Sequence, residues 1–203
     1  MNVKIGVLAI QGAIEEHAYM LNKVFKELGI NGKVVYVKKE HQLEEVNGLI
    51  IPGGETTVIG RVAEVNNLIN KIKTLGEQGL PIFGTCAGMV LLAKKIYDKV
   101  VGEVNQPTLE LMNMLVERNA FGRQRESFEM DLEIPVIGEK FRGIFIRAPV
   151  VREIWGNAEV ICKIDEGIVA VKQENLLATA FHPELTDDTR MHKYFLEHFV
   201  GLT

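Results

Sequence analysis

The segment that most constrains the fold of this chain runs from Pro81 to Ala93. Two apolar residues, Ile82 and Phe83, lead into the sequence Gly-Thr-Cys-Ala-Gly, and an apolar, helix-forming run follows at once. This order predicts a strand, a sharp turn and a helix with Cys86 at the apex, an arrangement called a nucleophile elbow when serine occupies the apex. Glycines suit such a turn because they tolerate positive φ and leave space beside the backbone. The start of a helix also favours the thiolate, which is the nucleophilic form of cysteine.

The same segment also fits an inert buried cysteine beside a glycine turn, which is a common arrangement. The choice between a nucleophile and a core residue therefore depends on the other catalytic groups that the chain offers. The second cysteine, Cys162, alternates with Val160 and Ile164 in an apolar run, and we expect a core or half-buried thiol there.

The first half of the chain alternates between strand and helix patterns. Residues 3–10 are apolar at nearly every position, which is typical of a strand that is buried on both faces. Apolar residues at helical spacing predict helices at 14–28, 58–65 and 68–78, and a further helix that runs from the elbow to near Tyr97. Short apolar runs predict strands at 33–37 and 48–51. The order predicts a parallel sheet with helices on both faces and right-handed crossovers.

The second half of the chain contains short apolar runs separated by turn residues. They predict strands at 128–134, 143–146, 159–164, 168–172 and 176–180, and their close succession indicates antiparallel strands added to the parallel core. Residues 117–125 are polar and basic and are expected to form a surface loop, whereas residues 189–200 are expected to close the chain as a helix. Because no repeat or linker interrupts this order, we expect residues 1–203 to form a single domain.

Composition excludes several classes of function. The 203 residues carry a net charge of −4, which gives no support for nucleic-acid binding. The two cysteines indicate a reducing compartment, and no apolar run is long enough to suggest a membrane span. The N-terminal apolar run lacks a basic leader and stops at residues 11–12, so we do not interpret it as a signal peptide. We therefore expect a cytoplasmic protein without a nucleic-acid or membrane partner.

Of the five histidines, His182 is the best candidate for the base that a cysteine nucleophile needs. It follows an apolar run and precedes a proline, and Glu184 lies two residues further on. In an extended chain these two side chains point to the same side, so the carboxylate can orient the imidazole towards the thiol. A plain strand-end turn fits the same tripeptide. We expect His17 to pack or form a buried hydrogen bond on the apolar face of its helix, and we expect His41, His192 and His198 to be surface groups.

Gly53 and Gly54 follow the third predicted strand, at the sheet edge where open α/β sheets place their sites. Consecutive glycines there leave backbone N–H groups free to point into a cleft. Together with the N–H of Ala87, they are candidates for an oxyanion hole. A simple β-turn is the alternative interpretation of the two glycines.

These motifs resemble those of the class I glutamine amidotransferases, which use a Cys-His-Glu triad. The class motifs are residues 84–88, 52–55 and 182–184. A closer resemblance is to the glutaminase subunit of pyridoxal 5′-phosphate synthase, and it rests on residues 11–12, 53–57, 117–124, 145–149 and 181–186. One departure is Thr56, where the resemblance leads us to expect serine; both side chains carry a hydroxyl.

The resemblance implies a flavodoxin-like three-layer sandwich and a role for each matching residue. The implied catalytic residues are Cys86 as the nucleophile, His182 as the base and acid, and Glu184 as the orienting carboxylate. The implied glutamine contacts are Gly54, Glu55, Thr56, Arg118, Ile146 and Arg147, with Gly54 and Ala87 in the oxyanion hole. Gln11 and Gly12 are implied to lie near the interface with a partner subunit.

The implied function is hydrolysis of L-glutamine to glutamate and ammonia, with the ammonia passing to a separate synthase subunit that makes pyridoxal 5′-phosphate (vitamin B6). Neither a cofactor nor a metal is implied. The resemblance also implies weak activity of the free subunit, for which reorientation of the Gly53-Gly54 peptide is one explanation. Three alternatives are the glutaminase of another amidotransferase, such as imidazole glycerol phosphate synthase, a stand-alone cysteine hydrolase and a non-catalytic regulatory protein.

Overall fold

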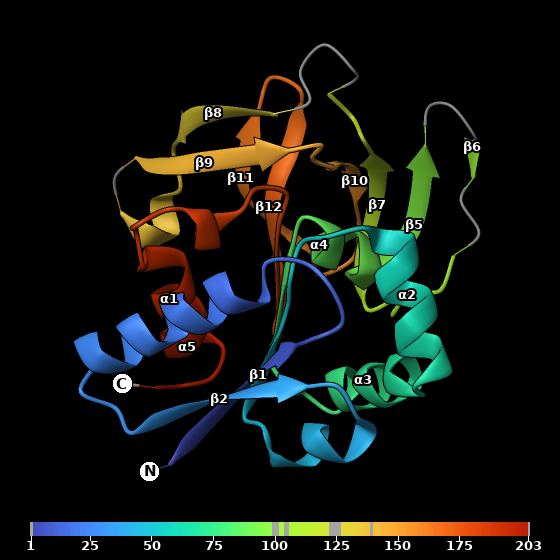
Figure 1. Ribbon diagram of the computed structural model, residues 1–203. Coiled ribbons are helices and arrows are strands. Elements are labelled where there is room, and N and C mark those ends of the chain that lie inside the picture. The colour runs from blue at the N-terminus through green and yellow to red at the C-terminus, as the bar shows by residue number, and fades with distance from the viewer. Residues whose placement is uncertain (1, 99–101, 104–105, 122–126, 139, 203) are drawn as a thin grey trace.

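The computed structural model describes residues 2–98, 102–103, 106–121, 127–138 and 140–202 (Figure 1). An eleven-stranded sheet runs through the molecule, and its strands follow the order β2-β1-β3-β4-β13-β12-β10-β7-β5-β6, with β11 paired to β12. The parallel part consists of β1 (Val3–Leu8), β2 (Gly32–Val37), β3 (Gly48–Ile51), β4 (Ile82–Thr85) and β13 (Leu176–Thr179). All residues of β3, β4 and β13 are buried, as expected for strands covered on both faces.

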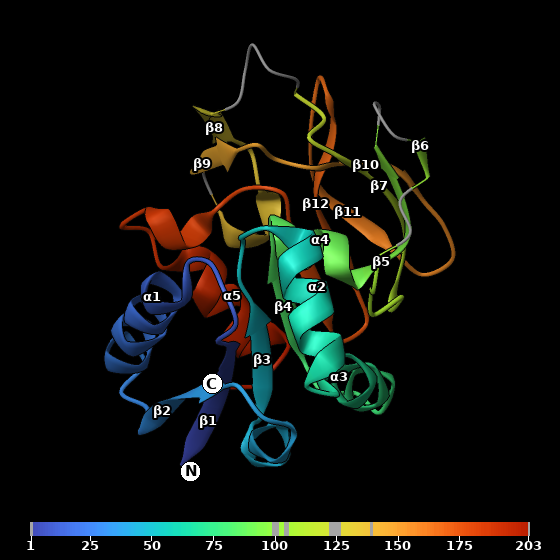
Figure 2. The same ribbon diagram turned by 45° about the vertical axis from the view of Figure 1, so that its right-hand side comes forward.

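Helices cover both faces of the parallel strands (Figure 2). One face carries α1 (Ile14–Glu27) and α5 (Arg190–His198). The other face carries α2 (Thr56–Val65), α3 (Leu68–Glu77) and the short helix α4 (Ala87–Leu92). Short 3-10 turns occupy Glu40–Glu45, Pro135–Ile137 and Pro183–Leu185. The predicted three-layer α/β architecture with added antiparallel strands is confirmed.

The rest of the sheet is mainly antiparallel. It comprises β12 (Gly167–Gln173), β11 (Glu159–Ile164), β10 (Val150–Ile154), β7 (Met112–Arg118), β5 (Ala93–Asp98) and β6 (Gly102–Glu103). Within this part, β5 and β7 are the parallel pair. A separate hairpin of β8 (Ser127–Leu132) and β9 (Phe141–Ile146) lies above α1 and α5 in Figure 1.

The structure corrects two sequence predictions in this region and adds one strand. The helix after the elbow ends at Leu92, and residues up to Asp98 form β5, because Ala93 adopts an extended conformation and the following residues pair with β7. The predicted surface loop begins later than expected, since Glu117 and Arg118 belong to β7. The strand β10 was not predicted. Residues 122–125 of the predicted loop lie outside the described residues.

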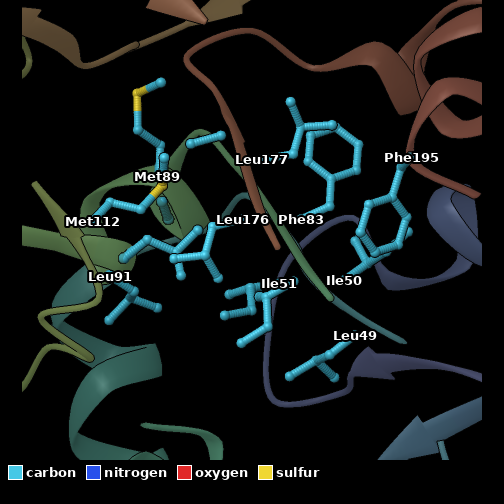
Figure 3. Close-up of a cluster of buried hydrophobic side chains, with 14 of the residues drawn as sticks. Leu49, Ile50, Ile51, Phe83, Met89, Leu91, Met112, Leu176, Leu177 and Phe195 are labelled. Carbon is cyan, nitrogen blue, oxygen red and sulfur yellow. The ribbon is translucent and has the colours of Figure 1, made fainter. Parts of the chain in front are cut away.

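The main hydrophobic core surrounds the parallel strands (Figure 3). The register aligns Ile50 of β3, Phe83 of β4 and Leu177 of β13 in one row. Phe195 of α5 packs on this row, with its ring centroid 5.6 Å from that of Phe83. On the other face, side chains of α4 such as Leu91 fill the layer. Burial on both faces fixes β4 and β13, the two strands that precede Cys86 and His182.

Candidate active site

Cys86 lies at a sharp turn between β4 and α4, as predicted for a nucleophile elbow. Its backbone has φ 50° and ψ −102°, a left-handed conformation that is uncommon for a residue with a side chain. Its N–H donates a hydrogen bond of 2.7 Å to the carbonyl of Thr179 on β13. A Cβ atom on Gly84 would lie 2.6 Å from the Gly88 carbonyl, and one on Gly88 would lie 2.2 Å from the Ile51 carbonyl oxygen. Both glycines are therefore required for the tight packing of the elbow.

His182 reaches Cys86 because β13 lies beside β4. The two strands run parallel with Thr179 opposite Thr85, so the residues that follow them meet at the same edge of the sheet. The backbone N–H of His182 donates a 2.8 Å hydrogen bond to the Ile144 carbonyl of β9, and this bond anchors the segment that follows β13. The side chain of His182 then makes a 2.7 Å hydrogen bond between its Nδ1 and Oε1 of Glu184.

Gly53 completes this arrangement from the end of β3. A Cβ atom at this position would lie 2.3 Å from Cε1 of His182 and 3.2 Å from Cβ of Cys86. The backbone of Gly53 therefore touches both side chains, which a larger residue would displace. The backbone N–H of Gly53 donates a 3.1 Å hydrogen bond to Oγ1 of Thr85. The loop formed by Gly53 and Gly54, called the glycine loop below, is thereby held to the elbow.

Electrostatics favour a protonated imidazole between a thiol and a carboxylate. Burial lowers the pKa of the His182 imidazole, but hydrogen bonds to Cys86 and Glu184, together with the charges of these groups, raise it to about 10. Burial raises the pKa of the Glu184 carboxyl, but the neighbouring His17 and the hydrogen bond from His182 lower it more. His182 is therefore placed to exchange a proton with the sulfur, and Glu184 carries the compensating charge.

A cavity of about 370 Å³ opens beside Cys86. Most of the residues that the sequence analysis selected line it: Gly12, Gly54, Glu55, Thr56, Cys86, Ala87, Arg118, Ile146, Arg147 and His182. Glu184 lies behind His182 and is buried. Gln11 does not line the cavity, but its Oε1 accepts a 3.2 Å hydrogen bond from the backbone N–H of Glu55, which does. The structure therefore brings the predicted residues to one place.

The charged groups of the cavity are held in place before any ligand binds. Nη1 of Arg118 donates a 2.9 Å hydrogen bond to Oε1 of Gln106. Nη2 of Arg118 lies 3.5 Å from Oε1 of Glu55. Glu55 also caps α2, accepting hydrogen bonds from the N–H groups of Thr57 and Val58 at 3.2 and 2.8 Å. Arg147 adopts a φ of 46°, a left-handed backbone conformation beside the cavity. The opposite charges of Arg118 and Glu55 suit a ligand that carries both a carboxylate and an ammonium group.

Several residues near the site were not selected from the sequence. Asn119 lines the cavity with a φ of 50°, and Gln106 supports Arg118. His192 was predicted to be a surface group, which is wrong: it is fully buried, because its side of α5 packs against α1 and β4. The buried hydrogen bond predicted for His17 is confirmed, whereas its contacts with Thr85 and Glu184 were not predicted. A polar residue on an apolar helix face signals burial but does not reveal its partner.

Cys162 has none of the features of Cys86. It is buried in the core, as predicted, and burial together with the charge of Glu133 raises its pKa to about 11. A thiol with so little thiolate is a poor nucleophile. Across the described residues, no group of three or more His, Cys, Asp or Glu side chains is arranged to hold a metal ion. In the same part of the chain, no helix has the length and apolar character needed to cross a membrane.

Comparison with known proteins assigns this site to a family. A model described as the SNO glutamine amidotransferase family matches residues 7–201, nearly the whole chain. The chain belongs to the SNO glutamine amidotransferase family. The prediction of an amidotransferase enzyme is thereby confirmed, and the curated relatives named below confirm the resemblance to the glutaminase subunit of pyridoxal 5′-phosphate synthase.

Curated relatives and a solved structure agree with this assignment. The chain is 54% identical to the pyridoxal 5′-phosphate synthase subunit PdxT of Moorella thermoacetica, covering 96% of this chain and 98% of that protein. It is 49% identical to the protein of the same name from Staphylothermus marinus, over 98% of this chain and 99% of the relative. A crystal structure of a glutamine amidotransferase superposes with a TM-score of 0.84 at 46% identity, covering 97% and 98% of the two chains. The predicted flavodoxin-like fold is confirmed.

Proposed function

We propose that this chain, acting as one glutaminase domain, hydrolyses L-glutamine to L-glutamate and ammonia with Cys86, His182 and Glu184 as its catalytic triad. The observation that carries the proposal is that Cys86 and His182 line one cavity, with the buried carboxylate of Glu184 hydrogen-bonded to His182. Cys86 and His182 both lie against the backbone of Gly53, and Nδ1 of His182 is hydrogen-bonded to Oε1 of Glu184 at 2.7 Å. A thiolate paired with an imidazolium is a competent nucleophile for acyl transfer.

In the proposed reaction, the Cys86 thiolate attacks the side-chain amide carbon of glutamine. The resulting oxyanion accepts hydrogen bonds from the N–H groups of Gly54 and Ala87, where one such donor is worth about 2.7–4 kcal/mol. His182 gives its proton to the departing nitrogen, so that ammonia leaves and a γ-glutamyl thioester remains. His182 then takes a proton from water, and the resulting hydroxide attacks the thioester. Glutamate leaves, and the thiolate of Cys86 and the protonated imidazole of His182 are restored.

The proposed glutamine pocket uses the charges of the cavity wall. Arg118 binds the α-carboxylate of glutamine, and Glu55 accepts a hydrogen bond from its α-ammonium group. The backbone around Gly54, Ile146 and Arg147 forms the rest of the pocket, and the hydroxyl of Thr56 adds a polar group at its rim. The distance of 3.5 Å between Arg118 and Glu55 supports this assignment, because each charge is only partly satisfied by the other.

We further propose that the ammonia passes to a separate pyridoxal 5′-phosphate synthase subunit in the cytoplasm. The relatives with this subunit name support the proposal, since their sequences match nearly the whole chain. Gly12 lines the cavity and Gln11 is hydrogen-bonded to Glu55, and we assign both residues to the interface with that subunit. A Cβ atom on Gly12 would lie 1.6 Å from the carbonyl oxygen of Gly53, so movement of Gly12 on binding is able to reorient the Gly53-Gly54 peptide and its N–H.

The test is glutamate release from glutamine by the purified chain, alone and with its cognate synthase subunit, beside the variant Cys86→Ala. The proposal predicts activity that rises when the synthase is added and that is lost in the variant. Strong activity that does not change with the synthase would instead indicate a stand-alone hydrolase or a different pathway. Absence of activity in every condition would indicate a non-catalytic protein.

A further inference from the structure

A second histidine, His17, lies behind the triad and is not exposed to the cavity. It comes from α1 and is fully buried, as is its neighbour His192 from α5, the helix that packs beside α1 in Figure 1. Nε2 of His17 lies 3.4 Å from Oε2 of Glu184, a buried oxygen that has no hydrogen-bond partner among the described residues. The other carboxylate oxygen, Oε1, is the one that binds His182. His17 therefore faces the free side of the orienting carboxylate.

The contacts of His17 define where its proton resides. Burial lowers the pKa of His17 more than the charge of Glu184 raises it, so the ring is neutral and carries one N–H. An unprotonated Nε2 would direct a lone pair at the carboxylate, so the proton belongs on Nε2. Nδ1 then accepts a hydrogen bond from Nε2 of His192 at 2.9 Å. This assignment leaves Nδ1 of His192 as a bare lone pair, which agrees with its lack of a partner in the described part of the chain.

The same nitrogen of His17 also connects the carboxylate to the glycine loop. Nε2 lies 3.1 Å from Oγ1 of Thr85, the residue before the nucleophile. Oγ1 of Thr85 in turn accepts the 3.1 Å hydrogen bond from the N–H of Gly53. One buried imidazole thus contacts both the carboxylate that orients His182 and the hydroxyl that holds Gly53.

We propose that His17 is a positioning residue for glutamine hydrolysis, which holds the Glu184 carboxylate through Nε2–H and fixes the Thr85 hydroxyl that anchors Gly53. The inference rests on the proposed role of the triad. Glu184 follows a proline in a short 3-10 turn, and its hydrogen bond to His182 uses one oxygen only. Without a donor on Oε2, the carboxylate is free to rotate away from the imidazole. A small misplacement of a catalytic group is enough to slow a reaction greatly.

The experiment compares two amide substitutions at this position. His17→Gln keeps an N–H donor near the position of Nε2, facing Glu184, whereas His17→Asn keeps a polar group only near Nδ1, facing His192, and leaves no donor at the position of Nε2. We expect His17→Asn to lower kcat for glutamine hydrolysis in the presence of the synthase subunit by between about 10- and 100-fold. KM should change less than about twofold because His17 does not line the pocket, and His17→Gln should recover most of the lost kcat. The rate of Cys86 alkylation by iodoacetamide in the free chain should follow the same order.

Two controls separate positioning from packing and from failure of the triad. Val24→Ala removes core volume from the same face of α1 and should lower the melting temperature while leaving kcat unchanged at temperatures below unfolding. The inference is wrong if His17→Gln and His17→Asn lose kcat equally, if neither loses it, or if the loss follows the melting temperature. The variant Glu184→Gln tests the underlying proposal. If it alkylates and turns over like the wild type, the triad assignment itself fails, whatever the result at His17.

Discussion

At the scale of single residues, the proposed chemistry depends on the proton of His182. Its imidazole lies between a sulfur and a carboxylate, and both groups favour the protonated ring. Such a ring is suited to donate a proton to a departing nitrogen and to take it back from water. This description leads to two predictions that concern individual side chains.

The first prediction concerns the pKa of His182. Since the partners raise the pKa to about 10, the ring should remain protonated as pH rises past 6.5, the ordinary value, and lose its proton only near pH 10. Replacing Cys86 by alanine removes a hydrogen bond and a charge, so the pKa should fall. NMR titration of the His182 ring signals in the wild type and in Cys86→Ala measures both values. An unchanged titration in Cys86→Ala would show that the two side chains do not share a proton.

The second prediction concerns Gly53, where a side chain has no space. The methyl group of Gly53→Ala would lie 2.3 Å from Cε1 of His182, so the imidazole must move away from Cys86. We expect a loss of kcat of about 100-fold or more. Gly29→Asn is the control, because Gly29 has a left-handed φ of 65° with open space around it and asparagine tolerates that conformation. Near-normal turnover by Gly53→Ala would contradict the described contact.

The residues of the proposed triad could be selected from the sequence for a physical reason. Cys86 and His182 each follow a buried strand, and parallel strands bring their carboxyl ends to one edge of the sheet. Glu184 was found through its spacing from His182. His17 and Thr85 could not be assigned, because a polar residue inside an apolar pattern is compatible with many buried partners. The packing of α1 against β4 and against the 3-10 turn Pro183–Leu185 identifies Thr85 and Glu184 as the partners of His17.

At the scale of elements, the elbow depends on how closely α4 approaches the sheet. Gly88 is the contact point, since a Cβ atom there would lie 2.2 Å from the carbonyl oxygen of Ile51 on β3. We predict that Gly88→Ala lowers the free energy of unfolding by about 1–3 kcal/mol, the usual cost of overpacking. Urea denaturation measures the change. Val65→Ala, a substitution at an exposed position on α2, should stay within about 0.5 kcal/mol of the wild type, and a Gly88→Ala variant as stable as this control would refute the prediction.

The element boundaries show where sequence patterns fail. The elbow helix was predicted to reach Tyr97, yet it ends at Leu92, because pairing of β5 with β7 determines the conformation of residues 93–98. The strand β10 was overlooked because Arg152 and Glu153 interrupt its apolar pattern. Arg152 is instead held by a 2.6 Å hydrogen bond to the buried Glu117 of β7, a pairing that no local pattern reveals.

At the scale of the whole molecule, strand order assembles the site. The alternation of strands and helices was sufficient to predict a parallel sheet, but it did not predict that β13 returns to lie between β4 and β12. That return places His182 beside Cys86, although the two residues are far apart in the sequence. Because the pairing of β4 with β13 depends on burial from both faces, the site is a product of the complete core.

We propose that Cys86 forms a glutamyl thioester during glutamine hydrolysis. Mass spectrometry that detects and locates this adduct on the chain is the most direct test. The chain is mixed with glutamine and the cognate synthase subunit, quenched with acid at short times and digested to locate any adduct. We predict a glutamyl group on Cys86 that disappears as glutamine is consumed, decays more slowly in Glu184→Gln and is absent in Cys86→Ala. Turnover of glutamine without an adduct at Cys86 in any of these samples, or with an adduct on Cys162, would contradict the proposed mechanism.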